Sequence, residues 1–553
     1  MISAILMKMF NVVVVVIVVV VVVIIYAVTT NFVTLSPNGR WSVLPSRMVM
    51  AETRQPVNDN ADQYDYHVVF STDCSEDHDF QSYVLFFHAE RVQQPGTITR
   101  IASGCTPQQR KRVQQDFDSN IRSISTRFRI HFTPGYAKID GDYFPYFNKP
   151  FGVKHWMEET FDYPKGYTTD NEDPPHTSGG PNSNAFSGGI HSKRKDRHSG
   201  ESDNDRDRDK NTDRIAIILI DPDMIPLRPL TGVFNKDHDR LWKTPTVPPA
   251  SHDENGRSDI GISIDTGTEP RVSRNDSSYY HQNSNYQGRR LRDGSPIAQQ
   301  YLLGPIWFKW NLTGVVDRGS PVHKLSRKQA TDSFMAGPPY MATGRDMWNI
   351  VQRWTELCIP VKRVYPNMLA EMYAYILAAA DLDLPHQVSQ SMMWSDARVQ
   401  YSEPWRSVED LPKDRMCDPS ILQELSDKPS ANFFHYCQPY SFNGYEIYKR
   451  AVGHTLLDCG HPLLEEPDGS LSAPSRYDYA SIHPVLTRRK PEKQLEWADR
   501  VNQREAFATC QLIRLFNDAM EHYRRSVCTA QIEQTGQALQ PNMEKTFRPP
   551  PTP

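Results

Sequence analysis

Two aspartates separated by one proline follow a six-residue apolar run in the segment RIAIILIDPDMIPLRPL, Arg214 to Leu230. Two carboxylates held this close repel each other unless a positive group lies beside them, and a hard divalent cation is a common solution. A cation bound only by Asp221 and Asp223 keeps coordination sites open for substrate phosphates. The pair therefore indicates a metal site that handles a nucleoside diphosphate, where the metal neutralises charge developing on the leaving diphosphate.

The D-x-D pattern alone has little specificity, because the polar segment DNDRDRDK of the same chain also contains it. The preceding strand distinguishes Asp221 and Asp223. Ile215 to Ile220 is a continuous apolar run, typical of a strand buried on both faces. Pro222 cannot donate to a sheet ladder, so the strand should end here and place the carboxylates at its C-terminal edge, where open α/β sheets bind ligands. The alternative is a turn that merely ends a strand.

The elements around this strand predict an α/β fold. HVVFS, within 64–90, is typical of a buried strand, and the spacing of Phe80, Tyr83, Val84 and Phe87 predicts a helix after it. Further helices are expected in GRDMWNIVQRWTELC and LAEMYAYILAAADLDL, and an amphipathic helix over about 504–528. Because strands and helices alternate, we expect a mostly parallel sheet flanked by helices.

Other segments cannot belong to that core. The apolar run Val12 to Val28 approaches the ~20 residues that cross a bilayer, so 1–33 is expected to be a signal anchor, the alternative being a cleaved signal peptide. Residues 34–63 are expected to form a stem. Two polar stretches, about 166–213 and 234–293, are predicted to be disordered insertions in a domain spanning 64–460. Residues 461–553 are expected to be a C-terminal extension.

The composition argues against one class of function, nucleic-acid binding, and makes the cysteines candidates for disulfides. With 62 Lys and Arg against 66 Asp and Glu, and no basic face rich in aromatic residues, we do not expect nucleic-acid binding. The eight cysteines show no zinc-binding spacing, so in a secretory compartment they are candidates for disulfides. In a continuous helix Cys510 and Cys528 would lie roughly 27 Å apart, so each needs a partner elsewhere.

Several motifs resemble one family when they are taken in order: HVVFSTDC, QQPGTITRIASGC, YFPYFNKPFGVKHWME, IAIILIDPDMIPLRPL, GPPYMATGRDMWNIVQRWTE, LAEMYAYILAAADLDLPHQV and FFHYCQPYSFNGYEIYKR. This is the order found in plant and algal peptidyl serine α-galactosyltransferases and hydroxyproline O-arabinosyltransferases. The resemblance covers roughly 64–165, 214–231 and 294–461, and it is weaker over 510–528. It implies a GT-A-like nucleotide-sugar fold, a UDP-sugar donor, Mn²⁺, and a Golgi or endoplasmic reticulum type II membrane protein with a lumenal catalytic domain.

The resemblance also implies a metal site. Asp221 and Asp223 would bind the Mn²⁺ that bridges the UDP diphosphate. His435, in FFHYC, resembles the C-terminal histidine that completes such sites, and its nitrogen would favour Mn²⁺ over Mg²⁺. The alternative for a histidine beside aromatic residues is a hydrogen-bonded core residue. The relatives usually carry a small residue such as alanine between the aspartates, so Pro222 is a departure.

Further site residues follow from position. Glu371, in LAEMYAY, matches the acidic position that would face the acceptor or the anomeric carbon, the alternative being a structural ion pair. Lys149 and Arg100 are candidates to pair with the diphosphate or with acidic neighbours, the alternative being a surface role. Ser71 and Thr72, after the first strand, are placed to touch the uridine or ribose.

The predicted function is transfer of galactose or arabinose from a UDP-sugar to Ser or hydroxyproline hydroxyls of secretory or cell-wall proteins, with metal assistance. Retention of configuration is implied by the family. The alternative is a non-catalytic carbohydrate-binding or scaffold protein of the secretory pathway that keeps the fold. A metal-dependent hydrolase is less favoured, because no second ligand cluster or water-activating base accompanies the aspartates.

Overall fold

The computed structural model describes residues 64–161, 214–232, 290–467 and 491–528, apart from residues 302, 400, 401, 427, 429, 450 and 451. All of these residues belong to one compact unit that begins at Asp62. The predicted anchor, the stem and most of the two predicted insertions lie outside the described residues. Within the described ranges, no helix combines the length and the apolar character needed to span a membrane.

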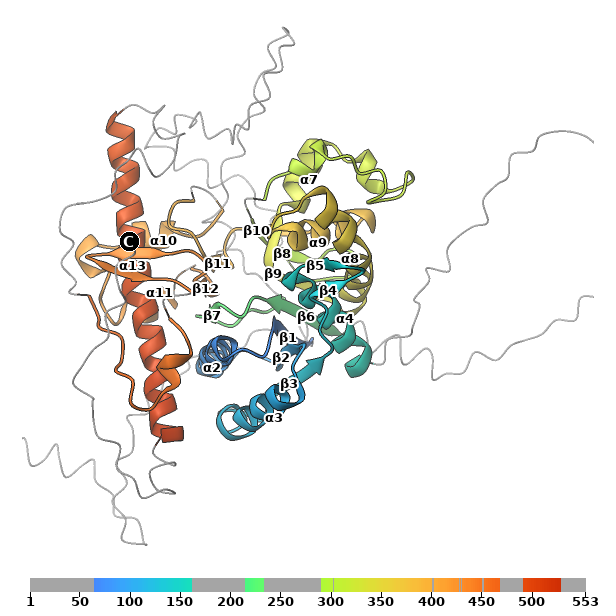
Figure 1. Cartoon of the computed structure of the whole chain (residues 1–553). Coiled ribbons are helices and arrows are strands. Elements are labelled where there is room, and N and C mark those ends of the chain that lie inside the picture. Colours follow the sequence, from blue (N-terminus) through green and yellow to red (C-terminus); the bar gives the residue numbers. More distant parts are fainter. Residues whose placement is uncertain are drawn as a thin grey trace, which may run out of the picture. The chain divides into compact units, whose positions relative to one another are not determined.

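A seven-stranded mixed sheet forms the centre of this unit, in the order β10-β8-β9-β6-β1-β2-β3 (Figure 1). Strands β3, β2, β1 and β6 run parallel, β10 is parallel to β8, and β9 is antiparallel to both of its neighbours. The predicted mixture of helices with a mostly parallel sheet is confirmed. The strands are β1 (Asp65–Thr72), β2 (Thr97–Ser103), β3 (Phe128–Thr133), β6 (Ile215–Ile220), β8 (Ile297–Gln300), β9 (Ala336–Thr343) and β10 (Gln387–Ser389).

Strand β9 lies inside the sheet although it contains two prolines, Pro338 and Pro339. Proline cannot donate a ladder hydrogen bond, and it is therefore unusual in a central strand. The register between β8 and β9 is irregular at this place: the successive β8 residues Ala298 and Gln299 pair with Tyr340 and Gly337, which flank the two prolines. The bulge thus falls where the amide donors are missing.

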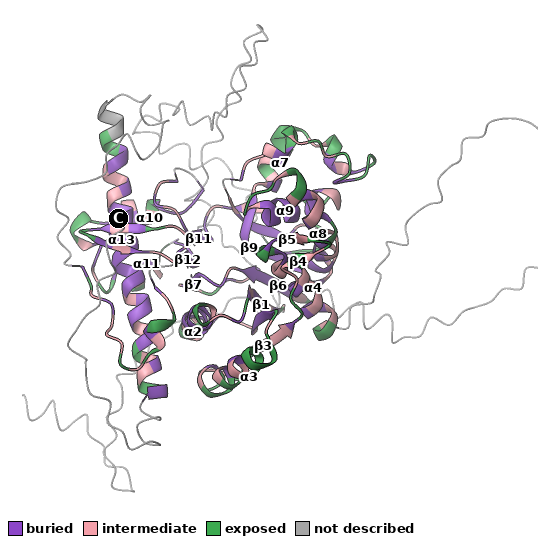
Figure 2. Ribbon diagram, in the orientation of Figure 1, coloured by how far each residue is buried: buried purple, intermediate pink, exposed green. Residues whose placement is uncertain are grey.

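Helices cover both faces of the sheet, and each face has its own core (Figure 2). On one face, α2 (Glu76–Arg91) and α13 (Pro491–Tyr523) pack with β6 residues Ile218 and Ile220. On the other face, α4 (Asn148–Phe161), α8 (Gly344–Val364) and α9 (Ala370–Asp381) pack with Ile217 and Leu219. Alternate β6 side chains thus enter opposite cores, as the continuous apolar run predicted.

A smaller sheet, in the order β11-β12-β7, lies beyond the end of β6. It consists of β7 (Met224–Pro226), β11 (Met393–Trp394) and β12 (Phe433–His435). Two hairpins are formed by β4 (Lys138–Ile139) with β5 (Asp142–Tyr143), and by β13 (Tyr440–Phe442) with β14 (Tyr445–Ile447). The other α-helices within the described ranges are α3 (Pro107–Asp116), α7 (Arg327–Phe334), α10 (Arg406–Glu409) and α11 (Ile421–Ser426).

Helix α13 is longer than predicted at its N-terminal end, because it begins at Pro491 rather than near residue 504. After Tyr523 the chain continues as a π-helical turn to Cys528. The expectation that Cys510 and Cys528 need separate partners is confirmed. The disulfides of the described residues are Cys74–Cys105, Cys417–Cys510 and Cys459–Cys528, whereas Cys358 and Cys437 are unbonded.

The second predicted insertion, 234–293, extends too far at its C-terminal end. Residues 290–293 belong to the described structure: the Leu291 side chain is buried, and its amide donates to the Gly232 carbonyl at 2.8 Å. The Asp293 carboxylate accepts a hydrogen bond from the Thr343 hydroxyl at 2.5 Å. The sequence RRLRD is polar apart from one leucine, so its composition resembles that of a disordered segment although that leucine enters the core.

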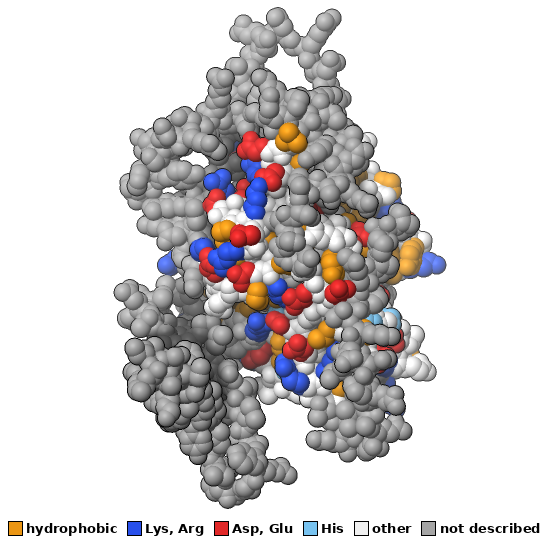
Figure 3. Space-filling model, turned by 90° about the vertical axis from the view of Figure 1, so that its left-hand side faces the viewer, with side chains coloured by type: hydrophobic (Ala, Val, Ile, Leu, Met, Phe, Trp, Pro, Cys, Tyr) orange, Lys and Arg blue, Asp and Glu red, His pale blue; other side chains and the backbone are white. Residues whose placement is uncertain are grey.

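Charged side chains of both signs share the surface. On the face drawn in Figure 3, Lys and Arg side chains are interspersed with Asp and Glu side chains. This distribution parallels the composition, in which basic and acidic residues are nearly balanced, with a net charge of -4.

Candidate metal and nucleotide-sugar site

The two aspartates stand on a turn that joins the large sheet to the small one. β6 ends at Ile220, and the Met224 amide donates to the Asp221 carbonyl at 3.1 Å, which closes a four-residue turn around Pro222. Proline suits the second position of such a turn because its φ is already near the required value. The predicted end of the strand at Asp221 is confirmed. Both carboxylates consequently lie at the C-terminal edge of β6.

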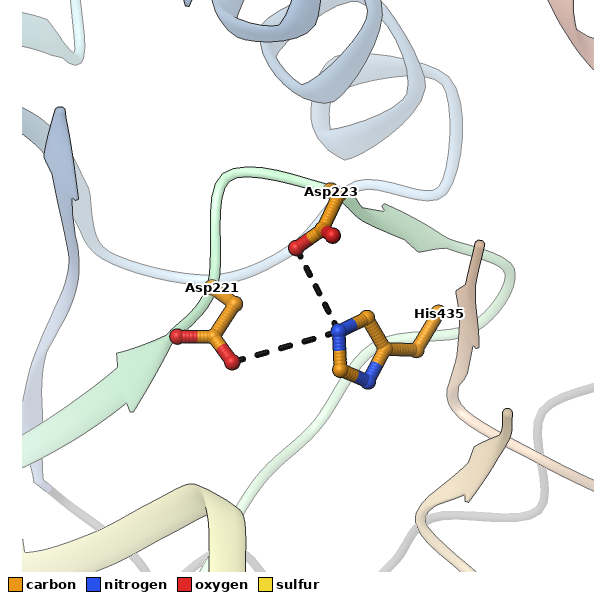
Figure 4. A group of neighbouring side chains, drawn as sticks. All are labelled: Asp221, Asp223 and His435. Carbon is orange, nitrogen blue, oxygen red and sulfur yellow. Dashed lines mark ion pairs between the residues drawn. The ribbon is translucent and has the colours of Figure 1, made fainter. Parts of the chain in front are cut away.

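Strand β12 brings His435 to the same turn from a distant part of the sequence. β12 pairs antiparallel with β7, and His435 stands opposite Met224 in that pairing. The His435 Nε2 atom lies 3.3 Å from Asp223 Oδ1 and 3.9 Å from Asp221 Oδ2 (Figure 4). One ligand atom from each of the three residues lies within 4.8 Å of the others. Asp223 and His435 are buried, and Asp221 is partly buried.

Each aspartate also has a lysine partner. Lys149 Nζ, from the first turn of α4, lies 2.6 Å from Asp221 Oδ1. Lys449 Nζ, just after β14, lies 3.1 Å from Asp223 Oδ2. The turn therefore carries two negative charges between two ammonium groups and an imidazole, which is the positive surrounding that two adjacent carboxylates require. Lys449 was not predicted as a site residue from the sequence. Its place in the motif NGYEIYKR was the only feature that pointed to such a role.

The charges of the site shift its proton equilibria. Burial alone would raise the pKa of Asp223, but Lys449 and His435 outweigh burial and hold it well below its usual value. Burial would lower the pKa of His435, but Cys437 and the Asp223 carboxylate raise it well above its usual value. Without a cation, these neighbouring charges favour the imidazolium form of His435, paired with Asp223. A metal ion would take the place of that proton, because a histidine ligand must be neutral.

Glu371 is joined to the site through a lysine. Its carboxylate lies 3.0 Å from Lys149 Nζ, and its side chain is buried at the start of α9. Burial raises the pKa of Glu371, although Lys149 acts against this. Burial in turn would lower the pKa of Lys149, but the Asp221 and Glu371 carboxylates outweigh it and raise that pKa. Trp354 fixes this corner by donating from Nε1 to the Glu371 carbonyl at 2.8 Å. Glu371 therefore makes the structural ion pair that was predicted as the alternative to a role toward the acceptor or the anomeric carbon.

Arg100 lies apart from the aspartate turn. It is buried, and its guanidinium contacts Asp79 Oδ1 at 2.7 Å, Thr72 Oγ1 at 2.9 Å and the Asp73 carbonyl at 3.1 Å. The surface alternative for Arg100 is therefore wrong, and an acidic neighbour is its partner. The Thr72 hydroxyl also donates to the Ile101 carbonyl at 3.4 Å. Ser71 is partly buried at the C-terminal end of β1, so contact of Ser71 and Thr72 with a nucleoside stays a prediction.

Comparison with known proteins gives one curated relative and a weak structural likeness. No family model matches the chain. It is 29% identical over 124 residues to a peptidyl serine alpha-galactosyltransferase of Arabidopsis thaliana. The match covers 22% of this chain but only 14% of that relative, so the chain spans a small part of the relative's length.

Two crystal structures of the galactosyltransferase LgtC, one with donor and acceptor sugar analogues and one of an active-site mutant, also match. They are 11% and 10% identical, and each match covers 68% of this chain and 88% of LgtC. Their TM-score of 0.26 is too low to establish a common fold. The sequence comparison alone confirms the resemblance inferred from the ordered motifs: this chain is similar to a peptidyl serine galactosyltransferase.

Proposed function

We propose that this chain is a glycosyltransferase that uses a nucleotide sugar as its donor. One observation carries the proposal: Asp221, Asp223 and His435 converge at the C-terminal edge of a buried strand, although β12 lies far from β6 in sequence. Two carboxylates and an imidazole, with lysines on both sides, form a site for a divalent cation and the phosphates bound to it. The resemblance to a peptidyl serine galactosyltransferase supports a sugar as the transferred group.

The residues present fit Mn²⁺ as the proposed ion. Two carboxylate oxygens and one imidazole nitrogen lie within 4.8 Å of one another, and a mixed oxygen and nitrogen set suits Mn²⁺ better than Mg²⁺. His435 Nε2 is the ring nitrogen that faces the two aspartates, so it is the atom that would bind the ion. When bound, the ion would supply positive charge for the leaving diphosphate.

The chain's own residues have separate proposed roles. Asp221, Asp223 and His435 hold the ion, and their strands orient them before substrate arrives. Lys449 is partly exposed beside Asp223, so its ammonium group is placed to contact a diphosphate oxygen of a donor bound at this edge. Lys149 positions Asp221 and supplies a second positive charge at the same edge.

Finer assignments belong to the same proposal. Ser71 and Thr72 would face the nucleoside from the neighbouring strand, while Arg100 supports that edge through Asp79 and Thr72. Glu371 would lie on the acceptor side. The transferred sugar is galactose or arabinose on UDP, the acceptor hydroxyl belongs to Ser or hydroxyproline, and the reaction retains configuration within a GT-A-like fold. The family resemblance supports each of these.

The proposed location is the Golgi or endoplasmic reticulum, with a single N-terminal membrane anchor and a lumenal catalytic domain. The apolar run Val12 to Val28 supports the anchor. Three disulfides within the described residues support an oxidising compartment, because disulfides are rare in reducing ones.

Thermal unfolding of the purified chain with UDP and Mn²⁺ tests the proposal. Ligands that bind only the folded protein raise its melting temperature, so UDP with Mn²⁺ should raise it and Asp223→Asn should abolish the shift. Asp346→Asn is the matched control: Asp346 is also buried, but it follows Thr343, which pairs with Ala216 at the opposite end of β6. No shift in the unmodified protein would favour a scaffold without a donor site.

A further inference from the structure

One loop of the described structure carries an asparagine in a triplet that enzymes of the secretory pathway recognise. Asn311-Leu312-Thr313 has the form Asn-X-Thr in which X is not proline, the acceptor pattern for N-glycosylation. A second triplet of this kind, Asn275-Asp276-Ser277, lies outside the described residues. Such triplets also arise by chance in a long sequence. The surroundings of Asn311 therefore decide whether it is suited to carry a sugar.

The residues on either side of Asn311 anchor the loop. The Trp310 ring stacks on the Tyr365 ring, with centroids 5.0 Å apart, and its centroid lies 5.1 Å from that of Tyr373. The Leu312 side chain packs against the core that α8 and α9 share, and its carbonyl accepts from the Val315 amide at 2.9 Å. The backbone of the loop is thus held to the folded domain on both sides of the asparagine.

Asn311 and Thr313 lie on the outer side of this loop. Both residues are exposed, whereas Leu312 between them is partly buried. Gly314 follows with a φ of +84°, and a Cβ atom built on it would meet no atom of the described structure within 4 Å. An N-linked oligosaccharide is bulky and hydrophilic, so it requires an open surface position of this kind.

The side chain of Asn311 is placed for the modification. Its Oδ1 atom accepts a hydrogen bond from the Thr313 amide at 3.1 Å, which closes a turn over the triplet. This bond occupies the oxygen and leaves Nδ2, the atom that receives the sugar, without a hydrogen-bond partner among the described residues. The Thr313 hydroxyl has none there either, so both groups of the triplet are accessible to a modifying enzyme.

We propose that Asn311 carries an N-linked oligosaccharide. In this reaction Nδ2 attacks the anomeric carbon of an oligosaccharide carried on a lipid diphosphate and loses one proton. A carbon–nitrogen bond forms, the bond from the anomeric carbon to the diphosphate oxygen breaks, and the lipid diphosphate leaves. The chain is the acceptor of this transfer and not its catalyst, so the inference goes beyond the proposed function. It rests on that function in one respect, the lumenal location of the domain.

Asn367 offers a matched position in the same protein. It is exposed, and its Oδ1 atom accepts from the Leu369 amide at 3.2 Å, which is the arrangement found between Asn311 and Thr313. Because the residue two places after Asn367 is leucine, the sequence there is not an acceptor triplet. Leu369→Thr creates one with similar local geometry. This variant tests the compartment independently of Asn311.

Peptide mass spectrometry locates the glycan. The full chain is produced in a eukaryotic host, treated with peptide N-glycosidase in heavy-oxygen water, and digested with trypsin. Cleavage after Lys309 and Arg318 releases the peptide WNLTGVVDR, in which Asn311 is the only residue with a side-chain amide. Enzymatic release of a glycan converts the asparagine to an aspartate that contains heavy oxygen. The mass of this peptide therefore reports on Asn311 alone.

Matched variants define the expected results. The heavy-oxygen label should appear in this peptide from the parent chain, from Asn275→Gln and from Thr313→Ser, which keeps the triplet. It should be lost in Thr313→Val, which keeps the asparagine and nearly the same side-chain volume but removes the hydroxyl that the triplet requires. Asn311→Gln should migrate faster than the parent chain on a denaturing gel by the mass of one glycan, and peptide N-glycosidase should abolish the difference.

The outcomes separate this inference from the proposed function. A glycan on Asn367 in Leu369→Thr together with an unlabelled Asn311 would overturn the modification and uphold the lumenal location. A label that persists in Thr313→Val would come from spontaneous deamidation and would also overturn the modification. Absence of glycan from every protein, Leu369→Thr included, would overturn both the modification and the lumenal location. The donor site is measured separately, by the melting-temperature shift with UDP and Mn²⁺.

Discussion

Lys149 joins Asp221 to Glu371: its ammonium nitrogen lies 2.6 Å from the first carboxylate and 3.0 Å from the second. All three groups are largely removed from water, so the charged form of each is stabilised by the opposite charges beside it. This contact links the end of β6, the start of α4 and the start of α9, and it holds the metal-binding turn in place before any substrate is present.

Lys149→Met should destabilise the fold by about 3 kcal/mol, because it leaves the buried Glu371 carboxylate and the partly buried Asp221 carboxylate without their shared counter-ion. Urea unfolding of the variant and of the unmodified chain measures the difference. The double variant Lys149→Met/Glu371→Gln should recover part of the loss, since it removes one of the two stranded charges. Additive effects of the two substitutions would contradict a coupled pair.

Lys449→Ala should destabilise the fold less than Lys149→Met, because the Lys449 side chain is 41% exposed and His435 stays beside the buried Asp223 carboxylate when the lysine is removed. It should weaken binding of UDP with Mn²⁺ about tenfold through loss of a charged contact to the diphosphate. Calorimetric titration measures this affinity. Lys413→Ala is the control, because Lys413 also pairs with an aspartate, Asp499, at an exposed position. The same UDP affinity in both variants would exclude Lys449 from the donor site.

Acid should destabilise the contact between α2 and α13. His88 is fully buried, and its Nε2 atom lies 2.8 Å from the Leu515 carbonyl. Burial lowers its pKa from 6.5 to about 4, the Leu515 carbonyl and Asp518 act against this, and Arg91 adds to it. Between these pH values the unfolded chain binds the extra proton and the folded chain does not, so stability falls as the pH drops from 6.5 to 4, by about 3 kcal/mol.

Unfolding free energies measured across this pH range check the contribution of His88. His88→Gln should flatten the dependence, because glutamine can donate to the Leu515 carbonyl without titrating. His323→Gln, at an exposed histidine, should leave the slope as it is. An unaltered slope in His88→Gln would assign the acid sensitivity to other groups.

The disulfide between Cys417 and Cys510 should stabilise the packing of α13. It closes a span of 93 residues, and cross-links of this kind typically contribute 2–4 kcal/mol, mainly by restricting the unfolded chain. The double variant Cys417→Ala/Cys510→Ala should lower the free energy of unfolding by about that amount without loss of binding of UDP with Mn²⁺. Cys437→Ala, at an unbonded and partly exposed cysteine, is a control for thiol removal in the unfolding measurement only, because Cys437 acts on His435 in the donor site.

The sequence predicted the strand and the two aspartates of the site well, because the relevant signals are local. Ile215 to Ile220 is β6 with the predicted bounds, and Pro222 closes the turn that follows it. An apolar run and a proline act through the backbone of neighbouring residues, so a single segment contains the information needed. The same holds for α2 and α9, whose apolar faces are visible in their own sequences.

What the sequence did not predict depends on distant contacts. Strand β9 was missed because Pro338 and Pro339 argue against a central strand, and only its pairing with β8 shows how the sheet accommodates them. Lys449 was missed because an isolated lysine after a hairpin resembles any surface lysine until Asp223 lies beside it. Arg100 lacked a visible partner, since Asp79 approaches it only when α2 folds against β2.

Manganese-dependent hydrolysis of a UDP-sugar is the measurement that tests the central claim most directly. UDP release from UDP-galactose and UDP-arabinose is followed with Mn²⁺ and with chelator, for the unmodified chain, Asp221→Ala, Asp223→Ala and the control Asp346→Asn. The account predicts release that requires Mn²⁺, persists in Asp346→Asn, and falls at least about a hundredfold in the other two variants, as when a charge-stabilising group is removed. Full Mn²⁺-dependent release by Asp221→Ala and Asp223→Ala would contradict it.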